Sequence, residues 1–463
     1  MKNLFGYLFC FSLVFLISCS EDDLNLSLTQ DKIYDGKLQN LEELQGLASG
    51  MYNRITAPTY YGRNYIIYGE VRSDNCYANG NSGRFTTVGK MSVSPNGDYA
   101  TNTWTDIYKV IASANMIIQQ DADAMKGNPE LIRHIIGQAY VVRALAHFDL
   151  LKLFGQQQTG GDLGVPYITS YIPSYAGEQI APARGKVAEN REAIMADIKT
   201  GLSLLSEELR DDSKQYITTH AANALKARVA QYFGDWETAK ATSLAVINSG
   251  NFIIAGANEY AQTWRNDEAA NSIFELAFSV DDNNDFNSLS FIYRGNTYGD
   301  IEVLEDLISV FDAGDVRGSY QMIGFETVQG QPRLRNLGKY PSADYSDNVP
   351  LFRIEEMVLI LAEAKIELGE SDALDILNQI PAKRNAKPFG EATKENVLLE
   401  RRRELCFEGF RFDDLARTGN DIPLVDPLKQ THGGPKHGSY NFAFPIPMGE
   451  LNANSNMVKN DGY

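Results

Sequence analysis

Hydrophobic residues recur every three or four positions along much of the chain, which is the spacing of one face of an α-helix. This spacing predicts helices over residues 38–54, 104–115, 130–153 and 187–206. Between these segments glycine, proline and polar residues interrupt the pattern, as they do in the connections between helices. The chain is therefore predicted to be mainly α-helical.

Two later parts of the chain share one design, a pair of helices separated by a glycine. Residues 218–233 and 236–248 form the first predicted hairpin, and residues 351–369 and 371–380 form the second. Alanines on these helices allow close approach, and each pair hides its apolar faces only by stacking on neighbouring helices. The design resembles tetratricopeptide-type repeats, with irregular spacing between the copies.

Two long stretches break the helical pattern. Residues 56–103 are rich in Gly, Asn, Ser and Tyr and show no sustained period, and residues 252–345 have the pattern of short strands and loops. Loop regions of this length are usually functional. The predicted fold class is thus mostly α, a tetratricopeptide-like superhelix of helical hairpins with two irregular loop and short-strand insertions.

The amino terminus has the pattern of an export signal. Its apolar run, residues 4–17, is too short to span a bilayer but has the length of a signal-peptide core. The run ends at Leu16-Ile17-Ser18-Cys19, which resembles a bacterial lipobox, where the signal is cut before a cysteine that carries lipid. We therefore predict a signal peptide over residues 1–18 and lipidation of Cys19.

An acidic segment follows the predicted lipid anchor. Residues 19–37 begin with Ser20-Glu21-Asp22-Asp23 after the cysteine, which resembles the surface-export signal of lipoproteins in the Bacteroidetes. A solvated tether fits the same composition. We expect a tether over 19–37, a binding domain over 38–463, and a lipid-anchored position on the outer membrane, exposed at the cell surface.

Composition and charge narrow the classes of function. Of the 463 residues, 43% are hydrophobic and 22% are charged, as in ordinary globular proteins. The formal net charge of −18 disfavours nucleic acid and anionic lipid as partners. Four cysteines are too few for a disulfide framework in a chain of this length, and whether Cys76 and Cys406 are free stays open.

Residues 400–419, ERRRELCFEGFRFDDLARTG, resemble the carboxy-terminal signature of the SusD/RagB family, which are surface nutrient-binding lipoproteins of the Bacteroidetes. Three further stretches agree in the expected order, at 143–150, 353–357 and 444–447. The likeness runs from the lipobox cysteine to the last few residues. It implies a SusD-like fold and, as partner, a SusC-like TonB-dependent outer-membrane transporter.

The signature itself has the pattern of an ion network between helices and not of a catalytic site. On a helix, Glu400 reaches Arg403 and Arg401 reaches Glu404, each pair three residues apart. Glu404 and Glu408 share one face and need a cation between them. The segment is therefore predicted to be structural.

Motifs for catalysis and for metals are weak or missing in the sequence. It contains no recognisable nucleophile, metalloprotease, phosphate-loop or dinucleotide motif, so we predict a protein that is not an enzyme and that needs no cofactor. Residues 281–285 imitate the start of a calcium loop, but Phe286 and Ile292 occupy its glycine and glutamate positions, which favours a solvated turn over calcium. With 60 acidic residues, a glycosidase pair stays an alternative.

Aromatic residues crowd the two insertions, together with amide, carboxylate and guanidinium groups. Flat aromatic faces stack on sugar rings, and such polar groups bond to hydroxyls, so these insertions have the equipment of a glycan platform. Packing of the same tyrosines against the helices is the alternative. Glu70 to Asp74 also resembles the family segment that leads into the ligand-binding loop. The candidate ligand-binding residues are Asp74, Asn75, Tyr77, Arg84, Tyr99, Trp264, Tyr293 and Tyr298.

The resulting prediction is a non-enzymatic, cell-surface lipoprotein that binds a nutrient oligo- or polysaccharide and delivers it to a SusC-like transporter. Only one of three tryptophans, Trp264, lies where it could serve as a platform, which keeps a peptide-binding member of the same family as an alternative. A helical scaffold without a small ligand and a glycoside hydrolase are the others.

Overall fold

The computed structural model describes residues 37–172, 180–295 and 298–463, of which Leu38–Tyr463 form one compact unit. The predicted signal peptide and Cys19 lie outside the described residues. Among the residues that are described, no helix is both long and apolar enough to cross a membrane.

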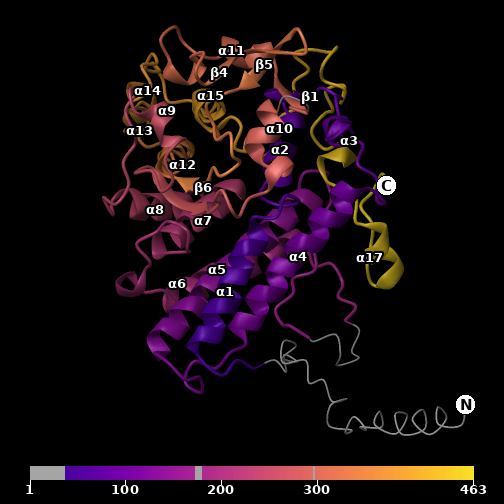
Figure 1. The fold of residues 1–463 in the computed structure, drawn as a ribbon, viewed down its shortest axis with the longest axis vertical. Helices are drawn as coiled ribbons and strands as arrows, with labels where there is room; N and C mark the ends of the chain where they lie inside the picture. Colours follow the sequence, from indigo (N-terminus) through magenta and orange to yellow (C-terminus); the bar gives the residue numbers. More distant parts are fainter. Residues whose placement is uncertain (1–36, 173–179, 296–297) are drawn as a thin grey trace, which may run out of the picture. The chain divides into compact units, whose positions relative to one another are not determined.

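The described part of the chain is built mainly of helices, with short strands in between (Figure 1). The helices are α1 (Leu41–Ile55), α2 (Asn64–Val71), α3 (Thr86–Gly89), α4 (Asp98–Ile118), α5 (Pro129–Phe154), α6 (Val187–Leu204), α7 (Thr219–Tyr232), α8 (Trp236–Ile247), α9 (Tyr260–Thr263), α10 (Leu289–Arg294), α11 (Glu305–Ser309), α12 (Ile354–Glu367), α13 (Ala373–Leu377), α14 (Gln379–Ala382), α15 (Lys394–Leu405), α16 (Arg411–Arg417) and α17 (Met448–Ala453). The strands are β1 (Cys76–Ala78), β2 (Ser272–Leu276), β3 (Ile301–Val303), β4 (Ile323–Val328), β5 (Gln331–Asn336) and β6 (Val349–Arg353).

Helix α5 is the centre of the first half of the unit and packs against α4 and α6 (Figure 1). It begins where the side chain of Asn128 accepts a hydrogen bond from the Glu130 amide at 3.0 Å, with Pro129 in the first turn, and it ends before the extended Gly155. Nearly all of its second half is buried, because neighbouring helices cover it on several sides. The helices predicted from the hydrophobic spacing are confirmed here.

Both predicted hairpins exist, and the second is shorter at its start than predicted. In the first, Gly234 adopts φ +70° between α7 and α8, and Asp235 caps α8. In the second, residues 349–353 form strand β6, which pairs with β2, so α12 begins only at Ile354. The fold class predicted from the sequence, a mostly α superhelix with insertions, is confirmed.

The first insertion is more ordered and more buried than its composition suggests. Within residues 56–103 lie α2, β1, α3 and the start of α4, and the tyrosines ahead of and within α2 belong to the core. Tyr60 and Tyr65 donate hydrogen bonds to Asp149 on α5, at 2.6 and 2.7 Å. The phenol hydroxyls are therefore satisfied inside the protein, which lets these rings act as core residues.

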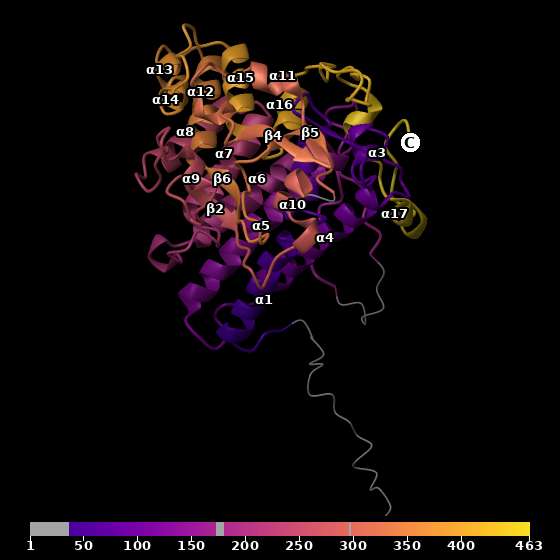
Figure 2. The same cartoon turned by 45° about the horizontal axis from the view of Figure 1, so that its top comes forward.

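The second insertion meets the first through strand pairing. Among the described residues the strands form two-stranded antiparallel sheets, β1 with β3, β2 with β6 and β4 with β5. In the first of these, Tyr77 lies opposite Glu302. Helix α10 lies next to the β4–β5 hairpin in both views (Figures 1 and 2). Segments more than 200 residues apart in the chain are thus brought to one place.

The family signature forms the buried ion network that the sequence predicts, with one change of partner. Arg353 bridges Glu404 and Glu408 at 3.1 and 2.7 Å, and Glu400 lies 3.6 Å from Arg403. Arg401 instead pairs with Asp414 of α16 at 2.8 Å. This exchange joins α15 to α16 across the turn between them.

The two cysteines whose state the sequence left open are free and buried. Burial raises the pKa of the Cys406 thiol to about 12 and the pKa of the Cys76 thiol well above its ordinary value. Both therefore act as small apolar core residues and not as nucleophiles.

Candidate functional site

Exposed aromatic side chains gather around α10. Phe286 is 53% exposed and Tyr298 is 42% exposed, whereas Phe291 between them is nearly buried. The ring centroid of Phe291 lies 5.0 Å from that of Phe286, 5.6 Å from that of Tyr298 and 5.9 Å from that of Tyr345. We call Phe286, Phe291, Tyr298 and Tyr345 the aromatic patch.

A short turn and the start of α10 position this patch. Phe286 lies on the 3-10 turn Asp285–Asn287, and Ser288 caps α10 by accepting a hydrogen bond from the Phe291 amide at 3.2 Å. Just before this turn, the Asn284 side chain donates to the carbonyl of Thr56 at 2.8 Å. The turn is therefore anchored to the loop after α1, which limits the movement of the exposed ring.

Arg84 connects the first insertion to the aromatic patch. Its guanidinium carbon lies 4.6 Å from the ring centroid of Tyr298, and its Nη1 donates to the carbonyl of Phe286 at 3.2 Å. Its Nε and Nη2 contact a carboxylate oxygen of the buried Asp300 at 2.9 and 2.8 Å. The structure thus brings together Arg84 and Tyr298, two of the residues predicted from the sequence.

A hollow of about 240 Å³ opens beside the patch, and its lining includes the rings of Phe291 and Tyr345 and the charged groups of Arg294 and Glu326. One guanidinium nitrogen of Arg294 donates to the Tyr340 carbonyl at 2.9 Å, while its buried Nε has no partner among the described residues. The hollow combines an aromatic wall with hydrogen-bonding groups of both kinds. This is the composition of a binding site for a polar ring.

Asp74 and Asn75 do not reach this surface, which corrects their assignment as ligand-binding residues. Asp74 is buried and pairs with Arg411 at 2.6 Å. Although burial raises the pKa of Asp74, the hydrogen bond and charge of Arg411 hold it below its ordinary value. Asn75 donates to Glu70 at 3.0 Å and accepts from Arg402 at 3.0 Å. Both residues connect the end of α2 to the signature helices.

Trp264 and Tyr293 are also buried, so neither can serve as a stacking platform. The indole of Trp264 packs edge-on against Tyr340 and lies under the ammonium of Lys339, 4.7 Å from its centroid. The hydroxyl of Tyr293 donates to the carbonyl of Phe407 at 3.3 Å. The sequence did not predict this burial, because the pattern of short strands around these residues gives only the local spacing of side chains. It does not show which face of a segment packs against the core.

Tyr77 and Tyr99 are half-buried, and their hydroxyls already have partners. Tyr77 donates to Glu302 at 2.7 Å, and Tyr99 accepts from the amide of Phe85 at 2.6 Å. These contacts hold β1 and the loop that carries Arg84 in place. Both residues therefore stabilise the backbone next to the candidate site.

Several patch residues were not among the candidates from the sequence. Phe286 counted there only as evidence against a calcium loop, and Tyr345 was not singled out. Phe291 and the neighbouring Arg294 belong to the aromatic and polar groups that the second insertion offers, but they were not among the eight candidates. A usable signal was the cluster of aromatic residues between 286 and 298. For Tyr345 no local signal exists, because the fold alone brings it next to α10.

Comparisons with known proteins give matches to SusD-type proteins in both halves of the chain. A family model described as "Starch-binding associating with outer membrane" matches residues 28–230, and the model of the SusD family matches residues 259–463. SusD-like protein P38 of Formosa agariphila is 24% identical over 80% of this chain and 82% of its own length. Starch-binding protein SusD of Bacteroides thetaiotaomicron is 29% identical over 37% of this chain and 30% of its own length.

Solved structures share the fold over about nine-tenths of this chain. A SusD superfamily protein from Bacteroides thetaiotaomicron is 26% identical with a TM-score of 0.82, over 91% of this chain and 99% of that one. A putative sugar binding protein from Bacteroides vulgatus is 26% identical with a TM-score of 0.81, over 92% and 99%. Since the two family models together take in most of the chain, and these structures extend the likeness across it, the chain belongs to the SusD family, as residues 400–419 indicated.

Proposed function

We propose that this chain is a lipid-anchored protein of the outer membrane that binds a nutrient glycan at the cell surface and delivers it to a SusC-like TonB-dependent transporter. Membership of the SusD family supports the role, and the names of its relatives refer to starch and sugar binding. The lipobox at Cys19 supports the anchor. The proposed binding surface is the aromatic patch with its adjoining hollow.

The observation that carries this proposal is the exposure of aromatic faces beside oriented polar groups. A sugar ring has apolar C–H faces and a rim of hydroxyls, so it needs a flat ring to stack on and both donors and acceptors around it. Phe286 and Tyr298 offer the faces, Arg84 and Arg294 the donors, and Glu326 the acceptor. A hollow of about 240 Å³ suits one ring of a longer chain that continues over the patch.

Binding without cleavage is part of the proposal. Glycoside hydrolysis needs two carboxyl groups flanking the bond that breaks. Among the described residues that line the hollow, Glu326 is the one carboxylic acid. Asp300 and Glu302, which are near in sequence to Tyr298, are occupied by Arg84 and by Tyr77 respectively.

The test is a glycan and peptide array followed by titration calorimetry with the best ligand. We expect Phe286→Ala and Tyr298→Ala each to weaken glycan binding by about tenfold or more, with unchanged melting temperatures. Tyr440→Ala is the matched control, since Tyr440 is 46% exposed but lies outside the patch. Parental affinity in both patch variants would refute this surface as the site, and binding of peptides alone would refute the glycan.

A further inference from the structure

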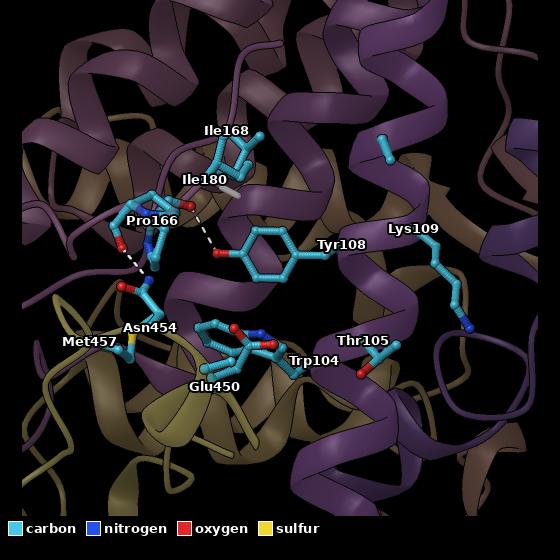
Figure 3. Close-up of a pocket in the computed structure, with 13 residues that line it drawn as sticks. Trp104, Thr105, Tyr108, Lys109, Pro166, Ile168, Ile180, Glu450, Asn454 and Met457 are labelled. Atoms are coloured by element: carbon cyan, nitrogen blue, oxygen red, sulfur yellow. Dashed lines mark hydrogen bonds between the residues drawn. The ribbon is translucent and has the colours of Figure 1, made fainter. Parts of the chain in front are cut away.

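A second cavity, of about 390 Å³, lies on a different part of the molecule (Figure 3). Its lining comes from three parts of the chain: α4, which we call the floor, segments 166–168 and 180–182, which we call one wall, and α17 with Met457, which we call the other wall. It shares no lining residue with the hollow beside the aromatic patch. Its volume is in the range of small-molecule sites.

The cavity is preformed and mostly apolar. Trp104 and Tyr108 lie one turn apart on α4, with ring centroids 4.9 Å apart. The Tyr108 hydroxyl donates to the Pro166 carbonyl at 2.8 Å, and the Asn454 side chain donates to the Pro182 carbonyl at 2.8 Å. These two hydrogen bonds tie one wall to the floor and to the other wall, so no rearrangement is needed to open the cavity.

Two polar groups in this cavity have no partner within residues 37–172, 180–295 and 298–463. The carboxylate of Glu450 makes no hydrogen bond or ion pair there, and the indole N–H of Trp104 donates to no acceptor. Burial raises the pKa of the Tyr108 phenol most, and the negative charge of Glu450 raises it further. The Glu450 carboxylate therefore lies close to Tyr108 on α4. The cavity thus offers one anion and one donor inside apolar walls.

Neither of the two nearby cations forms an ion pair with Glu450. The ammonium of Lys109 pairs with Asp106 at 2.8 Å and is directed away from Glu450 in Figure 3. The guanidinium of Arg184, which also acts on Tyr108, donates to the carbonyl of Gly164 at 2.7 Å and to other backbone carbonyls. A ligand that brings its own positive charge would therefore gain an ion pair in a partly desolvated place.

We infer that this cavity binds a small organic amine with an apolar body, whose ammonium pairs with Glu450 and whose body contacts the apolar walls. A hydrogen-bond acceptor next to the ammonium accepts from the Trp104 indole, and the aromatic floor favours a cation near it. The net charge of −18 adds a long-range attraction for cations. A free amine and the amino terminus of a peptide carry the same chemistry.

The experiment is titration calorimetry on the full-length, detergent-solubilised protein with matched probes. L-phenylalaninamide has the ammonium, the acceptor and an apolar body, whereas N-acetyl-L-phenylalaninamide carries a neutral acetamide in place of the ammonium. We expect the amine to bind about tenfold tighter than the acetylated probe, and Glu450→Gln to remove most of that difference. Asp461→Asn, which removes an exposed carboxylate elsewhere, is the matched control and should leave it unchanged.

A second variant tests, independently of charge, whether the amine binds in this cavity. Ala453 is exposed at the mouth of the cavity, so Ala453→Phe should fill it and abolish binding of the amine while the melting temperature is kept. Comparison with Phe-Gly-Gly-amide identifies the source, since equal binding supports peptide amino termini and weaker binding supports free amines. Equal affinity for the two phenylalanine probes, amine binding that survives both variants, or no amine binding at millimolar concentration would overturn the inference.

Discussion

Arg84 shows how a single residue links the interior of this protein to its candidate binding surface. One side of its guanidinium contacts Asp300, whose side chain is fully buried, and the same group lies over the exposed ring of Tyr298. Asp300 also accepts a hydrogen bond from the backbone of Ser82 at 3.0 Å. The buried ion pair therefore fixes the loop, and the loop fixes the aromatic platform.

A paired set of variants separates these two roles of Arg84. Arg84→Ala should lower the free energy of unfolding by about 2 kcal/mol, because it leaves the Asp300 charge buried without its partner. It should also weaken glycan binding about tenfold, since Tyr298 loses the group that orients it. Adding Asp300→Asn should restore most of the stability and none of the affinity, as measured by denaturant unfolding and calorimetry. Recovery of affinity together with stability would show that Arg84 acts on the fold alone.

At the scale of secondary-structure elements, α15 connects separate parts of the chain, because its buried carboxylates form ion pairs with arginines from several other segments. Glu404 accepts from Arg384 at 2.9 Å, from Arg353 at 3.1 Å and from Arg317 at 3.2 Å. Burial raises the pKa of Glu404, but the charges of these arginines outweigh burial and lower it well below its ordinary value. The network joins the second insertion to the hairpin that begins with α12.

Removal of the Glu404 charge should lower the stability of the folded protein. We expect Glu404→Gln to cost about 3 kcal/mol at pH 7, because it leaves buried arginines facing one another. Since the folded-state pKa of Glu404 is lowered, its contribution is present above the ordinary glutamate range and is lost as pH falls. The difference between parent and variant should therefore narrow between about pH 5 and pH 2 in denaturant unfolding.

Two further results complete the test of this network. Glu391→Gln, an exposed substitution just before α15, should leave stability nearly unchanged at every pH. A Glu404 variant as stable as the parent at pH 7 would mean that desolvation of the network outweighs its attraction.

At the scale of the whole molecule, the candidate site exists because two insertions meet. Strand β1 from the first pairs with β3 from the second, and this pairing brings the loop of Arg84 next to Tyr298. The helical body supplies the platform on which both insertions rest. The candidate binding surface therefore depends on contacts between residues more than 200 positions apart in the chain.

The proposed lipid anchor is the other property that belongs to the whole protein. We predict that Cys19→Ala abolishes lipidation, because the remaining cysteine near the terminus, Cys10, lies inside the apolar run and not after it. The measurement is metabolic labelling with a fatty-acid analogue, with Cys76→Ala as the control for loss of a thiol elsewhere. Labelling of the Cys19 variant at the parental level would contradict the lipobox.

The local sequence pattern was sufficient to predict those features that depend only on residues close together in the sequence. The apolar period of residues 130–153 predicted α5 almost to its ends, and three-residue spacing predicted the pair of Glu400 with Arg403. Both follow from helix geometry, which repeats every few residues regardless of the rest of the chain. Membership of the SusD family was visible for a similar reason, since its signature is a continuous stretch.

The tertiary structure alone decided which polar and aromatic residues are inside. Tyr60 and Tyr65 are core residues because Asp149, more than 80 positions away, accepts hydrogen bonds from their hydroxyls. Asp74 is internal because Arg411 pairs with it, whereas Phe286 is exposed and Tyr345 joins it from another loop. The sequence by itself determined the helices, the family and the predicted lipobox; the burial of amphipathic side chains depends on distant partners, so only the folded chain could decide the site.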